Sequence, residues 1–457
     1  MSLPVSIHTS KFGASRREKE MNILFDFHVV SPAAGGVSTV CRIFATEMIQ
    51  RFPENTYYAI VAEDLAAPFV HIPDRRAGDD LVNRLLFRTP KEQTALAPVP
   101  QEGTSGARRI YRENKLLHPL RVAWRYLMGQ RLRIEHWSER CDLDRQSRAF
   151  QKNCRKYGID VIHCPYQSIR PLPPRHLTGI PYIMNLHDLQ HEHFPSFFDP
   201  ALIRWRRMAW YDSARACRFV VAAASHVQED IVRYTGVPVE RVPVIPWGVP
   251  FEGEDEPSQG EITAVKMRFD LPSRFVLYPA ATWEHKNHLG LIKSLLLLKR
   301  EGQEIPLILT GSKEPFWGTI EAFIKAHGLD RMVRHLGFVA VSDLKALYKL
   351  AAAVVVPSLH EQTSGPVMEA MAMGCPVAAS RIADLPELLG EESGLLFDPM
   401  DMDQIARCLK VLWTEKERSS SMAIRSQLRL GTIRSWVSWG QSYNRLYRIC
   451  SEERNTG

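Results

Sequence analysis

Two carboxylates flank a segment whose residue types suit the recognition of a phosphate. In residues 353–377, AVVVPSLHEQTSGPVMEAMAMGCPV, Glu361 lies in a polar loop and Glu369 lies about one turn into a following helix. The apolar run before the loop predicts a buried strand, and Pro366 favours the first helical position. Gly374 is a typical residue for the end of that helix. The segment is therefore predicted to be a strand–loop–helix unit.

The backbone N–H groups of Thr363, Ser364 and Gly365 lie at the beginning of that helix and have no partner within it. They can therefore bind an anion. A carboxylate accepts hydrogen bonds from two neighbouring hydroxyls, such as those of a sugar. The arrangement predicts recognition of hydroxyls beside a phosphate. The structural alternative makes Glu369 an N-terminal helix charge and Glu361 part of a solvated loop.

An alternation of short apolar runs with amphipathic stretches predicts the elements that position this segment. Strands separated by helices favour parallel βαβ units, so we expect an α/β protein with two Rossmann-like halves. The runs that predict strands are 23–27, 57–62, 161–163, 182–186, 219–224 and 242–245, then 275–280, 307–310, 333–336, 353–356 and 376–380.

The same pattern predicts the domain organisation. Trp436, Trp439, Tyr443 and Tyr447 recur at helical spacing and indicate a packing seam on a last helix. We expect a disordered extension at 1–20, an N-terminal Rossmann-like domain at 21–249, an acidic linker at 250–262, a C-terminal Rossmann-like domain at 263–430, and a helix at 431–452 that packs back on the N-terminal domain.

Charge is concentrated in one part of the chain. The 457 residues carry a net charge of +7, and residues 108–156 alone hold 14 basic and five acidic side chains. The remainder sums to −2, which argues against a nucleic-acid coat. No apolar run approaches the roughly 18 residues of a membrane span. The eight cysteines lack metal-ligand spacing, which indicates reduced thiols in a cytosolic protein.

Glu361-x7-Glu369 followed by AMAMGCPV resembles the signature of the retaining glycosyltransferases of family 4, which have the GT-B fold. The resemblance extends over almost all of residues 21–450. It includes Gly35–Gly36 after the first strand, His187–Asp188, Ser225 in VAAASHVQEDI, VPVIPWGV at 242–249, YPAATWEHKNH at 278–288 and Asp398–Pro399. The resemblance implies two Rossmann-like domains that face each other across a cleft, with 21–249 as the acceptor domain and 263–430 as the nucleotide-sugar-binding domain.

The resemblance also implies residue roles. Glu361 corresponds to the glutamate that binds the donor sugar, Glu369 to the one that binds the ribose, and Lys286 to the lysine that neutralises the pyrophosphate. A preorganised ammonium stabilises the departing nucleoside diphosphate more than the ground state. His187 corresponds to a histidine that reaches the donor sugar. The alternatives are a surface lysine and a structural histidine.

The predicted catalytic residues are therefore Glu361, Lys286 and His187. The predicted donor-binding residues are Gly35, Gly36, His285, Lys286, Gly311, Thr363, Ser364, Gly365 and Glu369. One position departs from the family pattern, because Ala281 stands where family members commonly have an arginine that pairs with the lysine. The pyrophosphate is then expected to use His285, Lys313 or helix amides instead.

No metal or cofactor is expected. Asp142-Leu143-Asp144 and Asp401-Met402-Asp403 do not follow strands, as a metal-binding Asp-x-Asp should, and the second is predicted to start a helix. A metal cluster of His187, His191 and His193 lacks a supporting carboxylate pair. The absence of Gly-x-Gly-x-x-Gly after the first strand argues against a dehydrogenase.

The predicted function is transfer of a sugar, with retention, from a nucleotide-activated donor such as GDP-mannose or a UDP-sugar to a saccharide or lipid-linked acceptor. We expect a cytoplasmic enzyme of bacterial-type surface polysaccharide synthesis, working at the inner face of the membrane. The alternatives are a sugar-nucleotide epimerase of the same double-Rossmann architecture and a non-catalytic nucleotide-sugar-binding protein.

The basic insert 108–156 supplies a separate hypothesis. Residues 119–137 predict a helix with an apolar face that includes Trp124 and a cationic face that includes Arg121 and Arg125. Such a helix suits an anionic membrane surface, and the alternative is ordinary packing on the N-terminal domain. If the insert binds membranes, co-sedimentation with anionic vesicles falls when salt is raised or when 108–156 is deleted. Absent or salt-insensitive binding would favour packing.

Overall fold

The structure is a computed structural model, and it describes residues 20–27, 36–61, 67–86, 145–169, 172 and 178–456. Residues 1–19 of the extension expected at 1–20, the predicted helix at 119–137 and Asp142–Asp144 lie outside the described residues. The chain divides into two compact units, one of residues 1–162, 177–180 and 447–457, and one of 163–176 and 181–446.

The first half of the chain builds a six-stranded sheet in the order β3-β2-β1-β4-β5-β6. Pairs β1–β2 and β5–β6 are parallel, and the edge strand β3, which the sequence did not predict, is antiparallel to β2. The strands are β1 (Asn22–Asp26), β2 (Thr56–Ile60), β3 (Val70–Ile72), β4 (Val161–Cys164), β5 (Tyr182–Asn185) and β6 (Phe219–Val221).

The predicted strand at 242–245 is wrong. Only an isolated bridge joins Val244 to Ala222, beside β6. Pro243 and Pro246 explain the difference, because proline has no N–H to donate to a ladder.

Helices of the first half follow the strands, as expected for βαβ units. Residues 36–51 form a continuous helical run of α1 (Gly36–Ile43), a π-helical turn (Phe44–Met48) and α2 (Ile49–Arg51). Asp199 caps α8 by accepting a hydrogen bond from the Ala201 N–H, and Gly236 ends α9 at a φ of 72°. The others are α3 (Arg75–Leu86), a helix at 145–156, α7 (Gln190–His193), α8 (Pro200–Ala216) and α9 (Ser225–Thr235).

The second half builds a six-stranded sheet in the order β12-β11-β10-β7-β8-β9, with all neighbouring pairs parallel. Its inner strands are buried on both faces and read as near-continuous apolar runs, as in β10, whose four residues are at most 1% exposed. The strands are β7 (Val276–Pro279), β8 (Leu307–Thr310), β9 (Val333–His335), β10 (Ala353–Val356), β11 (Val377–Ser380) and the unpredicted β12 (Leu395–Phe397).

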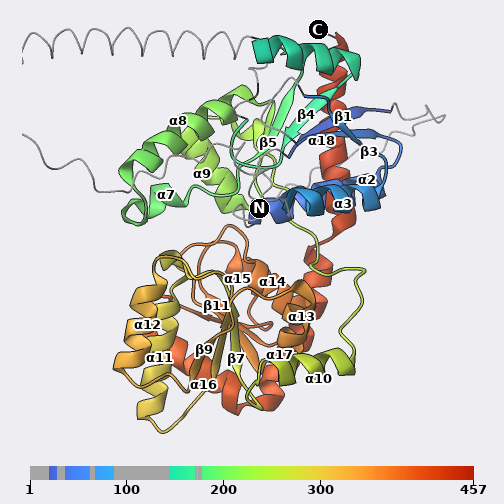
Figure 1. The fold of residues 1–457 in the computed structure, drawn as a ribbon. Coiled ribbons are helices and arrows are strands. Elements are labelled where there is room, and N and C mark those ends of the chain that lie inside the picture. Colours follow the sequence, from blue (N-terminus) through green and yellow to red (C-terminus); the bar gives the residue numbers. More distant parts are fainter. Residues whose placement is uncertain are drawn as a thin grey trace, which may run out of the picture. The chain divides into compact units, whose positions relative to one another are not determined.

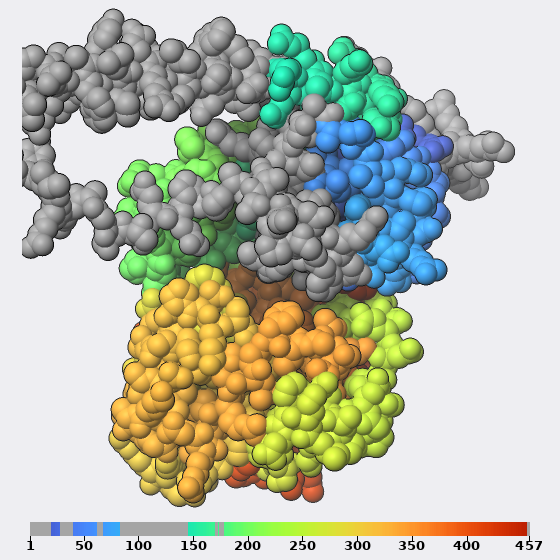
Figure 2. All heavy atoms as spheres, in the orientation of Figure 1, coloured from blue at the N-terminus to red at the C-terminus, as the bar shows by residue number. Residues whose placement is uncertain are grey.

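Helices cover this second sheet, as Figure 1 shows for α11 to α17. In Figure 2, closely packed yellow to orange atoms of the second half form the face turned to the viewer. Asp401 caps α16 by accepting from the Gln404 N–H, which confirms the predicted helix start. The helices are α10 (Gln259–Arg268), α11 (His288–Arg300), α12 (Trp317–Ala326), α13 (Val341–Leu350), α14 (Gly365–Ala372), α15 (Leu385–Leu389), α16 (Met402–Thr414) and α17 (Lys416–Ile433).

Only the first part of the acidic segment 250–262 is an irregular linker, although the composition predicts an irregular linker over the whole segment. Helix α10 begins at Gln259, because Ser258 and Glu261 form a capping box. Glu254 and Glu256 pair with Lys345 and Lys349 of α13. These ion pairs hold part of the segment against the second half of the chain.

The last helix, α18 (Trp436–Thr456), confirms the predicted seam. Trp439, Tyr443 and Tyr447 are at most 1% exposed. The Tyr443 hydroxyl accepts a 2.7 Å hydrogen bond from Asn185 at the end of β5, and its ring stacks on His163 of β4. The helix therefore packs on strands of the first sheet. No described helix is long and apolar enough to cross a membrane.

Gly311 follows β8, and its backbone conformation and close packing predict that a larger residue would destabilise the second sheet. Its φ is 112°, and a Cβ there would lie 2.8 Å from backbone atoms of Ala280 and Ala281. We expect Gly311→Ala to lower the free energy of unfolding by about 3 kcal/mol. The control Gly318→Ala lies in α12 with no atom within 4 Å of the added Cβ, and should remain within about 1 kcal/mol of wild type. Equal urea midpoints for the two variants would contradict the proposed strain.

Candidate functional site

The candidate site lies where the strand order of the second sheet reverses. From β7 the chain proceeds through β8 and β9 to one edge, then returns to β10 on the other side of β7. In open α/β sheets, ligands bind beyond the carboxyl ends of the two strands at such a switch point. Lys286 follows β7 and Glu361 follows β10, so the fold brings both to this point.

Backbone and side-chain hydrogen bonds hold the loops after β7 and β10 together. The Leu359 N–H donates to the His285 carbonyl at 2.7 Å, and the Asn287 amide donates to the Pro357 carbonyl at 3.0 Å. Asn287 has a left-handed φ of 55° and caps α11 by accepting from the Gly290 N–H. Its conformation ends the short 3₁₀ helix of Glu284–Lys286 and orients Lys286 beside the second loop.

Lys286 and Glu361 form an ion pair. The Lys286 Nζ lies 2.8 Å from Glu361 Oε1, with the two side chains 21% and 6% exposed. The Tyr278 hydroxyl donates to the Lys286 carbonyl at 2.8 Å and lies 3.2 Å from the Ser358 hydroxyl. Glu361 Oε2 has no hydrogen-bond partner in the part of the chain that the structure describes. This oxygen remains available to accept from a ligand hydroxyl.

A histidine that sequence reasoning did not single out holds the loop from another side. His226, the second residue of α9, donates through Nε2 to the Glu361 carbonyl at 3.2 Å. A carbonyl only accepts, so this bond assigns the ring proton to Nε2. In the sequence, only the motif VAAASHVQEDI pointed to the region around His226. The motif does not indicate that the histidine would bind the loop of Glu361.

The N–H groups predicted to bind an anion lie at the start of α14. Within the described residues, no acceptor engages the backbone N–H of Thr363, Ser364 or Gly365, and the buried Ser364 hydroxyl is likewise without a partner. Helix α14 begins at Gly365, so Pro366 is its second residue rather than its first. Gly374, at a φ of 66°, follows the helix end as predicted.

Glu369 is held by a tyrosine from a different helix. The Tyr348 hydroxyl, from α13, donates to Glu369 Oε2 at 2.6 Å. Burial raises the pKa of the Glu369 carboxyl, and the Tyr348 hydrogen bond opposes that shift. Tyr348 lies 21 residues earlier in the chain, and no local pattern indicated the contact. The carboxylate is thus desolvated and oriented before any ligand binds.

His187 follows β5 and is buried. Its Nε2 lies 3.1 Å from the Pro165 carbonyl, its ring stacks near Trp247 at 6.3 Å, and burial lowers its pKa. The imidazole is therefore neutral at pH 7. Among the described residues, no direct contact joins His187 to Lys286 or Glu361.

Of the other predicted donor-site residues, His285 lies in the short 3₁₀ helix that follows β7. Burial, Lys286 and His360 lower the pKa of His285 to about 3, so it also offers a neutral imidazole at pH 7. Gly36 begins α1, whereas Gly35 lies outside the described residues.

Lys313 is one of the groups expected to compensate for the arginine missing at Ala281. Its Nζ lies over the Trp317 ring, 4.5 Å from the ring centroid. The backbone at Ala281 packs against Gly311. Lys286 is the cation that the described geometry offers beside Glu361.

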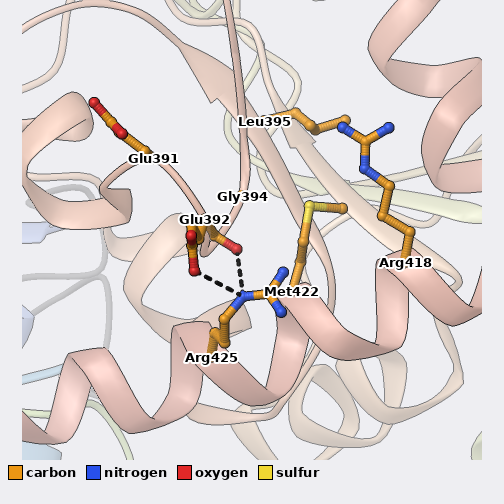
Figure 3. A pocket seen from close by; sticks show the side chains of 7 residues that line it. All are labelled: Glu391, Glu392, Gly394, Leu395, Arg418, Met422 and Arg425. Atoms are coloured by element: carbon orange, nitrogen blue, oxygen red, sulfur yellow. Dashed lines mark hydrogen bonds and ion pairs between the residues drawn. The ribbon is translucent and has the colours of Figure 1, made fainter.

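A surface hollow elsewhere in the second half of the chain contains none of the predicted site residues. Figure 3 shows Arg425 directed at Glu392, with a 2.9 Å hydrogen bond from its Nε to the Glu392 carbonyl. Its lining carries charges of both signs from α17 and the segment before β12, namely Glu391, Glu392, Gly394, Leu395, Arg418, Met422 and Arg425. Among the described residues, no three His, Cys, Asp or Glu side chains are arranged to hold a metal ion.

Comparison with known protein families divides the chain in two. Residues 261–429 match the family described as glycosyl transferases group 1, and residues 104–252 match the family described as Glycosyltransferase Family 4. The first match contains the loops that carry Lys286, Glu361 and Glu369.

Curated relatives and solved structures agree with these matches. The O-antigen chain mannosyltransferase B of Escherichia coli is 27% identical over 49% of this chain and 59% of its own length. The serotype-specific mannosyltransferase WbdA of Escherichia coli is 31% identical over 46% of this chain and 26% of its own length. The matched regions thus span about three fifths of the first relative and a quarter of the second. A crystal structure of Anabaena HepE in complex with UDP and glucose superposes with a TM-score of 0.64 at 16% identity, covering 94% of this chain and 100% of that one.

The raised pKa of Glu369 predicts a pH-dependent cost to stability. As pH rises above the ordinary carboxyl pKa and through the raised folded-state value, the folded protein must hold a desolvated charge. We expect Glu369→Gln to increase the free energy of unfolding at pH 8, and the gain to disappear towards pH 4. Tyr348 can still donate to the amide oxygen.

Urea unfolding without nucleotide at the two pH values measures this effect. The exposed Glu321 in α12, paired only with Lys325, supplies the control Glu321→Gln, which should show little change at either pH. A Glu369→Gln protein that is less stable at pH 8, or stabilised equally at both pH values, would contradict the expectation.

Proposed function

Because the chain belongs to the family 4 glycosyltransferases of the group 1 type, we propose that it transfers a sugar, with retention of configuration, from a nucleotide-activated donor to a saccharide or lipid-linked acceptor. The observation that carries the proposal is the Lys286–Glu361 pair at the switch point of the second sheet. Beside it lie the unengaged N–H groups of 363–365.

The charges of this pair suit the two ends of a sugar diphosphate. The Lys286 ammonium would neutralise the pyrophosphate, and the free Oε2 of Glu361 would accept from hydroxyls of the donor sugar. The amides of 363–365 would donate to anionic oxygen at the helix start. The neutral imidazole of His285 would add a hydrogen bond without adding charge.

Glu369 is proposed to bind the ribose hydroxyls of the donor nucleotide. Its orientation by Tyr348 fixes one carboxylate oxygen and leaves the other to accept from a hydroxyl. His187 is proposed to reach the donor sugar, and the Gly35–Gly36 turn to contribute to the donor site. The burial and fixed Nε2 contact of His187 favour a positioned side chain over a freely rotating one.

The proposed reaction is a front-face displacement. The bond between the sugar C1 and the leaving phosphate oxygen breaks, and the acceptor oxygen bonds to C1 on the same face. The acceptor proton passes to the departing phosphate. Lys286 accelerates this step because the leaving diphosphate gains negative charge in the transition state, and a fixed ammonium stabilises that charge. No metal is required for this step.

A mannosyl donor and an acceptor of bacterial-type surface polysaccharide synthesis are proposed on the strength of the two mannosyltransferase relatives. A UDP-sugar is the other donor class considered, because the HepE structure contains UDP and glucose. We propose that the enzyme works in the cytoplasm at the inner face of the membrane, where a lipid-linked acceptor is accessible.

A panel of nucleotide sugars offered to the purified protein tests the function. Transfer predicts release of nucleoside diphosphate from one donor class, together with a glycosylated product that retains the anomeric configuration. Epimerised donor without added acceptor would instead favour the epimerase. Binding of donor without hydrolysis or transfer, under any acceptor, would favour a non-catalytic binding protein.

Two substitutions separate binding from turnover. Lys286→Ala is expected to lower kcat about 100-fold, because it removes the cation that stabilises the leaving diphosphate. Glu369→Ala is expected to weaken nucleoside diphosphate binding by about 10- to 100-fold, through loss of hydrogen bonds to a charged acceptor. Steady-state kinetics and calorimetry measure these changes, and Lys325→Ala, on the exposed face of α12, serves as the control. Unchanged donor turnover in both site variants would refute the assignment.

A further inference from the structure

The donor loop is tied to two buried charges that are not among the predicted site residues. The Thr363 hydroxyl donates to Asp384 Oδ2 at 3.2 Å, and an Arg434 guanidinium nitrogen donates to the same oxygen at 3.3 Å. The Asp384 and Arg434 side chains are only 6% and 11% exposed. Asp384 immediately precedes α15, and Arg434 immediately follows α17. Three separate segments thus converge on one carboxylate.

Local geometry indicates that these contacts are imposed by tertiary structure. Ala383, the residue before Asp384, has a left-handed φ of 52°, which is unfavourable for a residue with a Cβ. Arg434 leaves the helical conformation with φ −129° and ψ 139°. Both charged side chains therefore project from breaks in regular structure, and the Ala383 break is strained.

The pair is poorly completed for a purely stabilising interaction. Asp384 Oδ1 and Arg434 Nε are buried and have no hydrogen-bond partner among the described residues. A buried ion pair contributes to stability only when its remaining polar atoms are also satisfied. The pair does, however, hold Thr363 through the hydrogen bond from the Thr363 hydroxyl to Asp384. The backbone N–H of Thr363 is one of the unengaged donors at the start of α14.

The negative charge of Asp384 explains why Arg434 is needed beside Thr363. A carboxylate fixes the Thr363 hydroxyl well, but it places a negative charge close to N–H groups that are proposed to bind a phosphate. The Arg434 guanidinium compensates that charge. Burial raises the pKa of the Asp384 carboxyl, and Arg434 is the foremost group opposing the shift, ahead of His226 and Thr363.

We propose that Asp384 and Arg434 are positioning residues of the donor site: Asp384 orients Thr363 and the N–H groups of 363–365, and Arg434 cancels the Asp384 charge so that the loop accepts the donor phosphate. This inference rests on the proposed function of the site. Neither residue touches the donor, and both act through Thr363.

Arg429 offers a matched control on the same helix. Its Nε donates to the Leu388 carbonyl at 3.0 Å, and a terminal nitrogen donates to the Glu387 carbonyl at 2.6 Å. It therefore links α17 to α15, as Arg434 links the end of α17 to the residue before α15, but it has no bond to Asp384 or Thr363. A general loss of packing between these helices would affect Arg429→Met and Arg434→Met alike.

The test measures UDP and GDP binding by calorimetry and donor kinetics for the full chain. Arg434→Met leaves Asp384 uncompensated and should weaken binding of the preferred nucleotide about tenfold, with a matching rise in donor KM and a smaller change in kcat. Adding Asp384→Asn should restore most of that affinity, because it removes the unpaired charge while keeping an acceptor for Thr363. Thr363→Val should raise donor KM, and Thr363→Ser, which keeps the hydroxyl that donates to Asp384, should raise it much less.

The outcomes distinguish this inference from the proposed function. If wild type binds neither UDP nor GDP and turns over no donor, the function and the inference both fail. If wild type binds nucleotide but Arg434→Met matches Arg429→Met, or the double variant is no better than Arg434→Met, only the positioning role is refuted. If Arg434→Met does not fold, the double variant and Thr363→Val still decide, because neither leaves an unpaired buried charge.

Discussion

The parallel pairing of β10 with β7 is the constraint on which the candidate site depends. These strands are 77 residues apart at their pairing positions, Ala353 beside Val276 and Val354 beside Leu277, with β8 and β9 between them in the chain. Only this pairing brings the loop with Lys286 against the loop with Glu361. The bonds from Leu359 to His285 and from Asn287 to Pro357 then fix the distance between the two charges.

Three buried or partly buried carboxylates surround this point, and each is compensated in a different way. Glu361 is paired with the Lys286 ammonium, Glu369 accepts from the Tyr348 hydroxyl, and Asp384 is paired with Arg434. Desolvated carboxylates oppose folding unless they are paired or hydrogen-bonded. The protein therefore holds polar groups in place at some expense of stability, which is the arrangement expected of a preorganised binding site.

The first sheet contributes residues to the candidate donor site, and these residues follow the ends of its strands. His187 follows β5, and His226 near the start of α9 follows β6 and donates to the carbonyl of Glu361. Helix α18 supports these strands, because Tyr443 contacts both Asn185 and His163. The aromatic seam of the last helix thus stabilises the sheet that positions His187, a predicted donor-site residue.

The sequence by itself determined the alternation of strands and helices, the two Rossmann-like halves, the last helix and the segment around Glu361 and Glu369. Periodicity, proline and glycine act locally, so they are readable without a fold. It did not reveal the short edge strands β3 and β12, and it predicted a strand at 242–245 that two prolines prevent. Only the tertiary structure decided that Tyr348 holds Glu369, that His226 holds Glu361, and that Asp384 and Arg434 hold Thr363. These partners come from other elements, and their contacts depend on strand order and helix packing, which no local pattern encodes.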